Sequence, residues 1–181
     1  MAGKASIEQA GYWAQLAAGM AIQHVGVVSF SRAELLHRFD YGETSGKIMT
    51  LEQLRRSLPH QELPLVFTNG YFDDVSAGHL KFLHQLKTLK GFNVVAINSD
   101  RSISQQKGAA PLLNERERAL LLSAIESINR VIIFDDIDAS HLIRTLRPEM
   151  IVKGEHYRNQ SLPEQEAIDD VGASIEFFPE Y

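Results

Sequence analysis

The sequence contains no cysteine, which excludes disulfide bonds, thiolate nucleophiles and cysteine-ligated zinc sites. It also lacks an excess of positive charge, because the formal net charge is -5, and we expect no broad attraction to nucleic acid or to an anionic membrane. The longest apolar stretch near the N-terminus, residues 12–28, is interrupted by Gln15, Gln23 and His24 and is too short to span a bilayer. No signal-peptide pattern is visible. These absences predict a cytoplasmic protein that binds neither nucleic acid nor membrane.

What is present is typical of a soluble globular chain, with 44% hydrophobic and 23% charged residues in a length of 181. The pattern changes near residues 59–64, between Pro59 and Pro64. We therefore predict a helical N-terminal segment with its linker at residues 1–60 and a second domain at 61–181. The N-terminal part has helical patterns at 6–24, 31–39 and 50–58, each opened by a capping pair, and a candidate short strand at 25–30.

From Leu65 onward, strand-like runs alternate with helical patterns. The runs are continuous and rich in β-branched residues, as expected when helices cover both faces of a parallel sheet. The predicted fold is α/β, a Rossmann-like parallel five-stranded sheet with helices on both faces. Strands are expected at residues 65–69, 93–99, 130–134, 149–153 and 174–178, and helices at 76–91, 114–128, 139–147 and 163–172.

Small polar residues follow three of these strands. Because ligands of such sheets bind beyond the carboxyl ends of the strands, the three clusters are expected to face one crevice. Turns rich in Asn and Gly are common, yet three clusters on one edge favour a phosphate or nucleotide site over coincidence. The clusters are Thr68, Asn69 and Gly70; Asn98, Ser99 and Asp100; and Lys153 and Gly154.

The stretch "DDVSAGHLKFL" places Gly78 and His79 at the start of a predicted helix. The unpaired N–H groups and the dipole of a helix N-terminus favour an anion, and a glycine lets a phosphate approach the backbone closely. His79 can donate a hydrogen bond to a phosphate oxygen. The alternative is that Gly78 only permits close packing and that His79 is a surface residue.

Two cations are candidates for binding phosphate. Lys107 is predicted to lie in a loop after the second strand, within reach of a polyphosphate, unless it is a solvated loop lysine. Arg118 lies in the first turns of a predicted helix, where a cation opposes the helix dipole unless it has an anionic partner. Glu115 and Glu117 are alternative partners for it. No set of histidines or carboxylates has metal-ligand spacing, so no protein-held metal site is predicted.

These motifs, "TNGYFDD", "AGH", "NSD", "KG", "ERERALLL" and "VKG", resemble in order those of the cytidylyltransferase-like nucleotidyltransferases. The resemblance covers about residues 65–178 and is closest to the adenylyltransferase domain of bifunctional heptose 7-phosphate kinase / heptose 1-phosphate adenylyltransferases. The N-terminal segment resembles the last helices of a ribokinase-type sugar kinase without its catalytic region. We expect it to be a kinase-tail remnant.

The resemblance implies that a sugar 1-phosphate attacks the α-phosphate of ATP or CTP, with Mg²⁺, and that pyrophosphate is released. It assigns catalysis to His79 and Lys107 and to the position of Ser76. It also implies self-association as a homodimer or higher oligomer, through the apolar N-terminal segment. The nucleotide-binding residues that it implies are Thr68, Asn69, Gly70, Phe72, Asp73, Gly78, Asn98, Asp100, Arg118, Lys153 and Gly154.

The sequence departs from the family pattern at three places. Ser76 stands where the family has the first of two histidines, and Ala110 stands where an arginine usually precedes the proline. The chain ends at Tyr181, where the family continues into a segment that helps to hold the triphosphate. The alternative hypothesis is therefore a catalytically impaired relative that acts as a nucleotide- or protein-binding module.

Overall fold

The computed structural model describes residues 45–179. The helices expected within residues 6–39, the strand at 25–30 and the kinase-tail remnant lie outside this part, so they stay predictions. The same holds for self-association through that segment and for the cytoplasmic location. Residues Gly46–Tyr181 form one compact unit. Within the described residues, no helix has the length and apolar character needed to cross a membrane.

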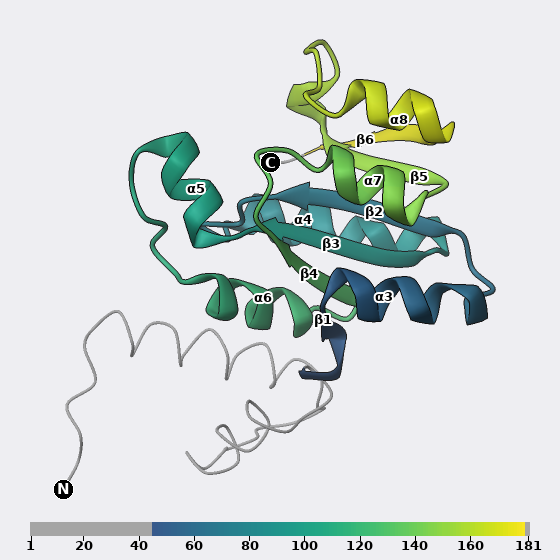
Figure 1. Ribbon diagram of the computed structural model, residues 1–181, viewed down its shortest axis with the longest axis horizontal. Helices are drawn as coiled ribbons and strands as arrows, with labels where there is room; N and C mark the ends of the chain where they lie inside the picture. The colour runs from purple at the N-terminus through teal and green to yellow at the C-terminus, as the bar shows by residue number, and fades with distance from the viewer. Residues whose placement is uncertain (1–44, 180–181) are drawn as a thin grey trace, which may run out of the picture. The chain divides into compact units, whose positions relative to one another are not determined.

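The core of the fold is a parallel sheet in the order β1-β4-β3-β2-β5-β6 (Figure 1). The prediction of five strands was therefore wrong by one. The additional strand is β1, which contains only two residues and pairs with β4 through Ile48 and Met49. A strand this short has no periodic pattern, so pairing with a distant strand defines it. The strands are β1 Ile48–Met49, β2 Leu65–Gly70, β3 Phe92–Asn98, β4 Arg130–Phe134, β5 Met150–Gly154 and β6 Ser174–Phe178.

Two of the helices begin at caps that the sequence predicts. Thr50 and Gln53 form the expected capping box at the start of α3, and Asn114 caps α6. The predicted helix at 76–91 ends earlier as an α-helix and continues as a 3₁₀ turn. The helices are α3 Leu51–Ser57, α4 Ala77–Gln85, α5 Asp100–Lys107, α6 Glu115–Ser123, α7 Ser140–Leu146 and α8 Gln165–Val171, with 3₁₀ turns at Ser45–Lys47, Leu58–His60, Leu86–Leu89 and Glu155–Tyr157.

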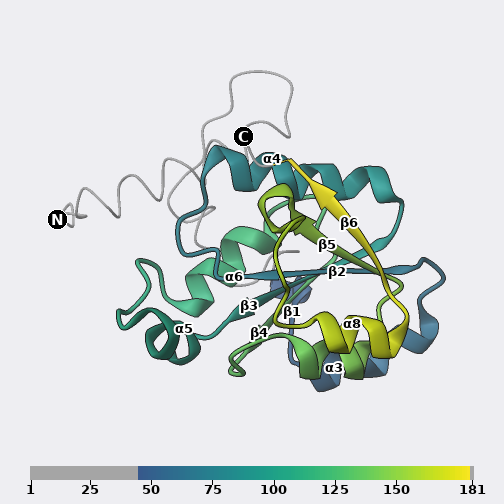
Figure 2. The same cartoon turned by 90° about the horizontal axis from the view of Figure 1, so that it is seen from above.

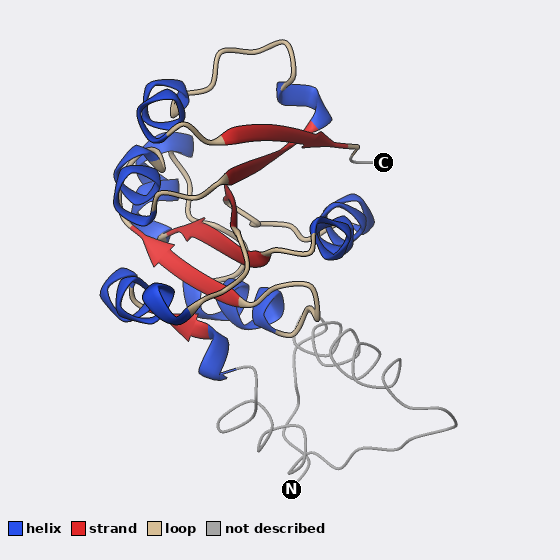
Figure 3. Cartoon of the chain, turned by 90° about the vertical axis from the view of Figure 1, so that its right-hand side faces the viewer, coloured by secondary structure: helices blue, strands red, loops and turns tan. Residues whose placement is uncertain are grey.

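Two layers of helices enclose the sheet (Figures 2 and 3). Helices α3, α7 and α8 pack on one face, around Phe67, Ile143 and Ile168. Helices α4 and α6 pack on the other face, around Leu83 and Leu122. Successive residues of β2 and β3 contribute alternately to the two clusters. Because both faces are buried, these strands are apolar without alternation, as the sequence predicted.

Two segments differ from the sequence interpretation. Helix α3 was grouped with the N-terminal segment, but its residue Leu54 is fully buried in the core of the sheet. Residues 100–107 were predicted as a loop, whereas they form α5, so Lys107 is the last residue of a helix. Ser99 caps this helix, and Gly108 ends it with a φ of 73°, a conformation that suits glycine.

The order in which strands are added to the sheet reverses at β2. The chain runs from β2 outward to β3 and β4, and then crosses back to place β5 on the other side of β2. Pairing of β2 with β5 covers only Val66 with Met150 and Phe67 with Ile151. By contrast, β2 pairs with β3 as far as Gly70, and β5 pairs with β6 as far as Gly154. The carboxyl ends of β2 and β5 therefore part from each other at the topological switch point, where α/β sheets bind ligands.

Candidate functional site

A cavity of about 350 Å³ lies at the parted ends of β2 and β5. It brings together most of the residues that the sequence predicted for the site, from β2, the loop after it, α4, α5 and β5. These residues are Thr68, Asn69, Gly70, Phe72, Asp73, His79, Lys107, Lys153 and Gly154. Sequence reasoning missed the other lining residues, which are Tyr71, Asp74, Phe82, His156 and Tyr157.

Five predicted residues do not line this cavity: Ser76, Gly78, Asn98, Asp100 and Arg118. Asn98 is buried, and its amide donates to Ser102 Oγ at 3.0 Å. The carboxylate of Asp100 accepts from Arg118 at 2.7 Å. These residues at the end of β3 are thus engaged with the protein itself.

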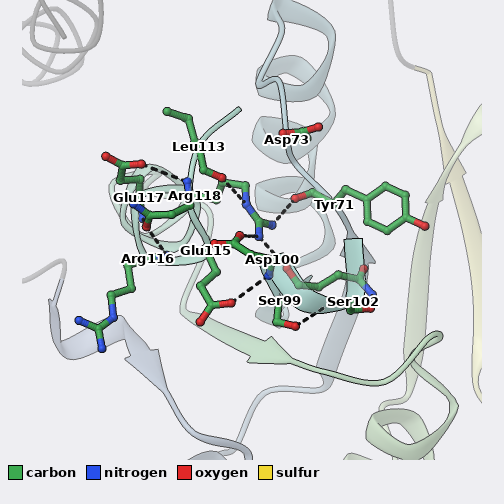
Figure 4. A network of polar contacts seen from close by, with 12 residues as sticks. Tyr71, Asp73, Ser99, Asp100, Ser102, Leu113, Glu115, Arg116, Glu117 and Arg118 are labelled. Carbon is green, nitrogen blue, oxygen red and sulfur yellow. Dashed lines mark hydrogen bonds and ion pairs between the residues drawn. The ribbon is translucent and has the colours of Figure 1, made fainter. Parts of the chain in front are cut away.

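Arg118 is the centre of this second group (Figure 4). Its guanidinium donates to the carbonyl oxygens of Tyr71 at 2.6 Å, Asn98 at 2.8 Å and Leu113 at 3.1 Å, in addition to Asp100. The side chain is 0% exposed. The prediction that Arg118 clamps a phosphate does not fit this geometry. Asp100 is the anionic partner that the sequence predicted for a cation at this position of the helix. The arginine connects the ends of β2 and β3 to the start of α6.

Three polar side chains, hydrogen-bonded to one another, join β2 to β5 where the two strands part. Lys153 Nζ donates to Glu164 Oε1 at 2.6 Å and to Asn69 Oδ1 at 2.8 Å, and Asn69 Nδ2 donates to the same Glu164 oxygen at 2.9 Å. Lys153 and Glu164 are only 5% and 3% exposed. Side chains thus connect β2 to β5 beyond the last paired residues.

Glu164 is a residue that the sequence analysis missed. Burial by itself would raise its pKa, but the attraction of Lys153 and the hydrogen bonds from Lys153 and Asn69 hold the pKa below its ordinary value. The only signal for Glu164 in the sequence was its place at the start of the predicted helix at 163–172, where acidic residues are common because they stabilise the helix dipole. Only the fold shows that this position faces Lys153.

Asp73 fastens the loop after α5 to the loop after β2. Its carboxylate accepts from the N–H of Leu112 at 2.7 Å and from Lys107 Nζ at 3.4 Å. The Lys107 ammonium also lies 4.7 Å from the centre of the Tyr71 ring. Because the Lys107 side chain is 43% exposed and its ion pair is long, its charge is available to an anion in the cavity.

Ser76 and His79 form a reciprocal capping box at the start of α4. The serine hydroxyl accepts from the His79 N–H at 3.3 Å, and the imidazole Nδ1 accepts from the Ser76 N–H at 3.3 Å. The ring also contacts Phe72, with 5.6 Å between ring centres. Phe72 has a φ of 48°, an unusual conformation for a bulky residue that is found at ligand sites.

A resident metal site is not apparent in the part of the chain from 45 to 179, where no three histidine, aspartate or glutamate side chains are grouped to hold an ion. Among the groups that line the cavity, the half-exposed Lys107 and His79 can bind an anion, whereas the charge of Lys153 is paired with Glu164. This set suits an anionic ligand, with the helix α4 beginning at its rim.

Known proteins are similar to this chain in sequence and in fold. The chain is 35% identical over 169 residues to bifunctional protein HldE of Geobacter sulfurreducens, covering 90% of this chain and 34% of the relative. It is 34% identical to bifunctional protein HldE of Syntrophotalea carbinolica, covering 97% of this chain and 37% of the relative. The chain thus spans about a third of the length of these relatives.

A solved structure, the lipopolysaccharide core biosynthesis protein from Thermoplasma volcanium, shares the fold. It superimposes with a TM-score of 0.53 at 24% identity and covers 66% of this chain and 97% of that one. The sequence profile of the cytidylyltransferase-like family matches residues 67–178, which include most of β2, all of β3 to β6 and every residue of the cavity. The chain belongs to the cytidylyltransferase-like family, as its motifs predicted.

Proposed function

We propose that this protein is a nucleotidyltransferase that transfers the nucleoside monophosphate of ATP or CTP to a sugar 1-phosphate. A phosphate oxygen of the sugar 1-phosphate forms a bond to the α-phosphorus of the nucleotide. The bond from that phosphorus to the bridging oxygen breaks, and pyrophosphate leaves with the electron pair. The observation that carries the proposal is the cavity at the switch point, which is lined by the family's motif residues from four different elements.

The protein's part in this reaction is to position the reactants and to stabilise charge. His79 is proposed to donate to an α-phosphate oxygen, and Lys107 to neutralise the β- and γ-phosphates that leave. The main chain at Thr68–Gly70 is proposed to contact the nucleotide. Mg²⁺ is proposed to arrive bound to the triphosphate, whose phosphate oxygens supply part of its ligands.

AMP transfer from ATP to heptose 1-phosphate is the specific reaction that we propose. Its support is the resemblance to the heptose 1-phosphate adenylyltransferases together with the similarity to bifunctional HldE proteins. The relatives exceed this chain in length about threefold, so this assignment rests on the shared third.

The direct test is release of pyrophosphate from purified protein. The protein is incubated with Mg²⁺, ATP or CTP, and heptose 1-phosphate or another sugar 1-phosphate. We expect turnover with ATP and heptose 1-phosphate. His79→Ala is expected to lower kcat on the order of 10²-fold, because it removes a donor that acts on developing charge. If no pair of substrates releases pyrophosphate, the transferase proposal is wrong, and calorimetry with ATP alone then tests the binding-module hypothesis.

Lys107→Met is expected to weaken binding of the Mg²⁺-bound triphosphate about tenfold, since it removes a half-exposed cation from the cavity. Binding is measured by calorimetry at two salt concentrations, and the loss should be smaller at high salt. The matched control is Lys87→Met, which removes an exposed lysine that pairs with Glu126 and does not line the cavity. Equal affinities for the two variants would contradict a phosphate-binding role for Lys107.

A further inference from the structure

We infer that Ser76 is a positioning residue that fixes the tautomer of His79, so that the Nε2 nitrogen carries the proton and donates into the cavity. The inference rests on the proposed function only for the use that is made of this donor. The tautomer itself follows from the hydrogen bonds at the start of α4. The serine that departs from the family pattern thereby gains a specific role through the histidine that remains.

The main-chain N–H of Ser76 is the first of two contacts that favour this tautomer. Its N–H points at His79 Nδ1 at 3.3 Å, and an N–H group can only donate. The accepting Nδ1 therefore has its lone pair free and carries no proton. A neutral imidazole has one N–H, so the proton lies on Nε2.

The Ser76 hydroxyl reinforces this arrangement. Its oxygen lies 3.0 Å from His79 Nδ1 and also accepts from the His79 main-chain N–H. A hydroxyl can do both, because it has one proton to donate and two lone pairs to accept. With the proton on Nε2, the serine hydroxyl caps the helix and donates to Nδ1 at the same time.

Nε2 is the His79 nitrogen that remains to contact a ligand. His79 lines the cavity, its Nδ1 is held by Ser76, and its ring rests against Phe72. Within residues 45–179, Nε2 makes no hydrogen bond with the protein. A donor held in this way meets a phosphate oxygen without first having to exchange its proton, which is the property that charge stabilisation requires.

The test separates helix capping from positioning by two substitutions. Ser76→Thr keeps a hydroxyl that both donates and accepts. Ser76→Asp keeps a good helix cap, but an ionised carboxylate only accepts. The aspartate is therefore expected to draw the proton to Nδ1 and to leave Nε2 as an acceptor, because a charged carboxylate in place of the hydroxyl 3.0 Å from Nδ1 outweighs the longer main-chain contact of 3.3 Å. Both variants are expected to unfold at the same temperature as the unsubstituted protein within a few degrees.

The readout is the tautomer, which needs no substrate. Long-range proton–nitrogen correlation spectra of ¹⁵N-labelled protein are recorded at about pH 8, where histidine side chains are mostly neutral. The His79 signals are identified by their loss in His79→Gln. We expect the Nε2–H form in the unsubstituted protein and in Ser76→Thr, and the Nδ1–H form in Ser76→Asp. In the pyrophosphate assay, kcat is expected to fall on the order of 10²-fold in Ser76→Asp and less than about threefold in Ser76→Thr.

The outcomes separate this inference from the proposed function. An Nδ1–H signal in the unsubstituted protein, or an Nε2–H signal that persists in Ser76→Asp, overturns the inference whatever the activity. The expected tautomers together with a full kcat in Ser76→Asp overturn the role in catalysis. The expected tautomers in a protein that releases no pyrophosphate support the positioning by Ser76 and contradict the proposed function instead.

Discussion

Replacing Glu164 with leucine is expected to lower the free energy of unfolding by about 3–5 kcal/mol, because the substitution leaves the ammonium of Lys153 buried without its anionic partner. Asn69 loses an acceptor at the same time. Urea-induced unfolding, followed by circular dichroism, measures the change. The matched control is Glu166→Leu in the first turn of α8, which breaks only an exposed ion pair with Arg144 at 3.5 Å and should cost less than about 0.5 kcal/mol.

A double variant identifies the cause of this loss. If the unpaired charge is responsible, adding Lys153→Met to Glu164→Leu should restore at least about 1 kcal/mol, since a buried ion pair can be replaced by apolar side chains at little cost. Equal stability of the single and double variants would mean that the loss comes from poor packing around α8 instead.

The same ion pair gives the protein a defined response to acid. The folded-state pKa of Glu164 lies below the ordinary value of 4.5, so its contribution to stability is complete above that pH. The contribution is lost as the pH falls through the lowered folded-state pKa. The difference in unfolding free energy between the unsubstituted protein and Glu164→Leu should therefore be constant from pH 7 to about pH 5 and shrink in more acidic buffers. A difference that grows with acid would contradict this.

Arg118→Met is expected to lower the free energy of unfolding by about 3 kcal/mol or more. The substitution removes a fully buried guanidinium whose hydrogen bonds satisfy three carbonyl oxygens and Asp100, and each buried group left without a partner costs about 1–3 kcal/mol. Arg118→Lys should fall between the two proteins, because one ammonium cannot reproduce the planar fork. Thermal and urea unfolding give the values.

The control for this second prediction is Arg116→Met, an exposed arginine on the same helix, with an expected change within about 0.5 kcal/mol. Comparing Arg118→Met with Arg116→Met also tests whether Arg118 binds phosphate or supports the structure. If Arg118→Met unfolds like Arg116→Met but binds the triphosphate far more weakly, Arg118 contacts the nucleotide after all and the structural role is wrong.

Features that are local in the chain could be predicted from the sequence. The buried strands were recognisable because β2 and β3 are covered on both faces, and the caps at Thr50 and Asn114 follow from residues three apart. Helix α5 was missed although Ser99 and Gly108 mark its two ends, since its polar composition offers little apolar periodicity.

Features that depend on distant parts of the chain could not be predicted. Glu164 is separated from Asn69 by 95 positions, and strand β1 is defined by a partner that begins at Arg130. Arg118 was identified as a residue with unusual electrostatics, but the sequence could not show whether its partner was a ligand or the protein. Burial decided between the two, and burial belongs to the fold.

The return of the chain from β4 to β5 has a consequence for folding during synthesis. Asn69 leaves the ribosome 95 residues before Glu164, an interval of roughly 5–20 s at usual rates of translation. During that time β2 can pair with β3, while its other edge has no β5 to cover it. The nascent chain therefore holds half of its cavity early, with an open strand edge, and closes it only when Lys153 and Glu164 have been made.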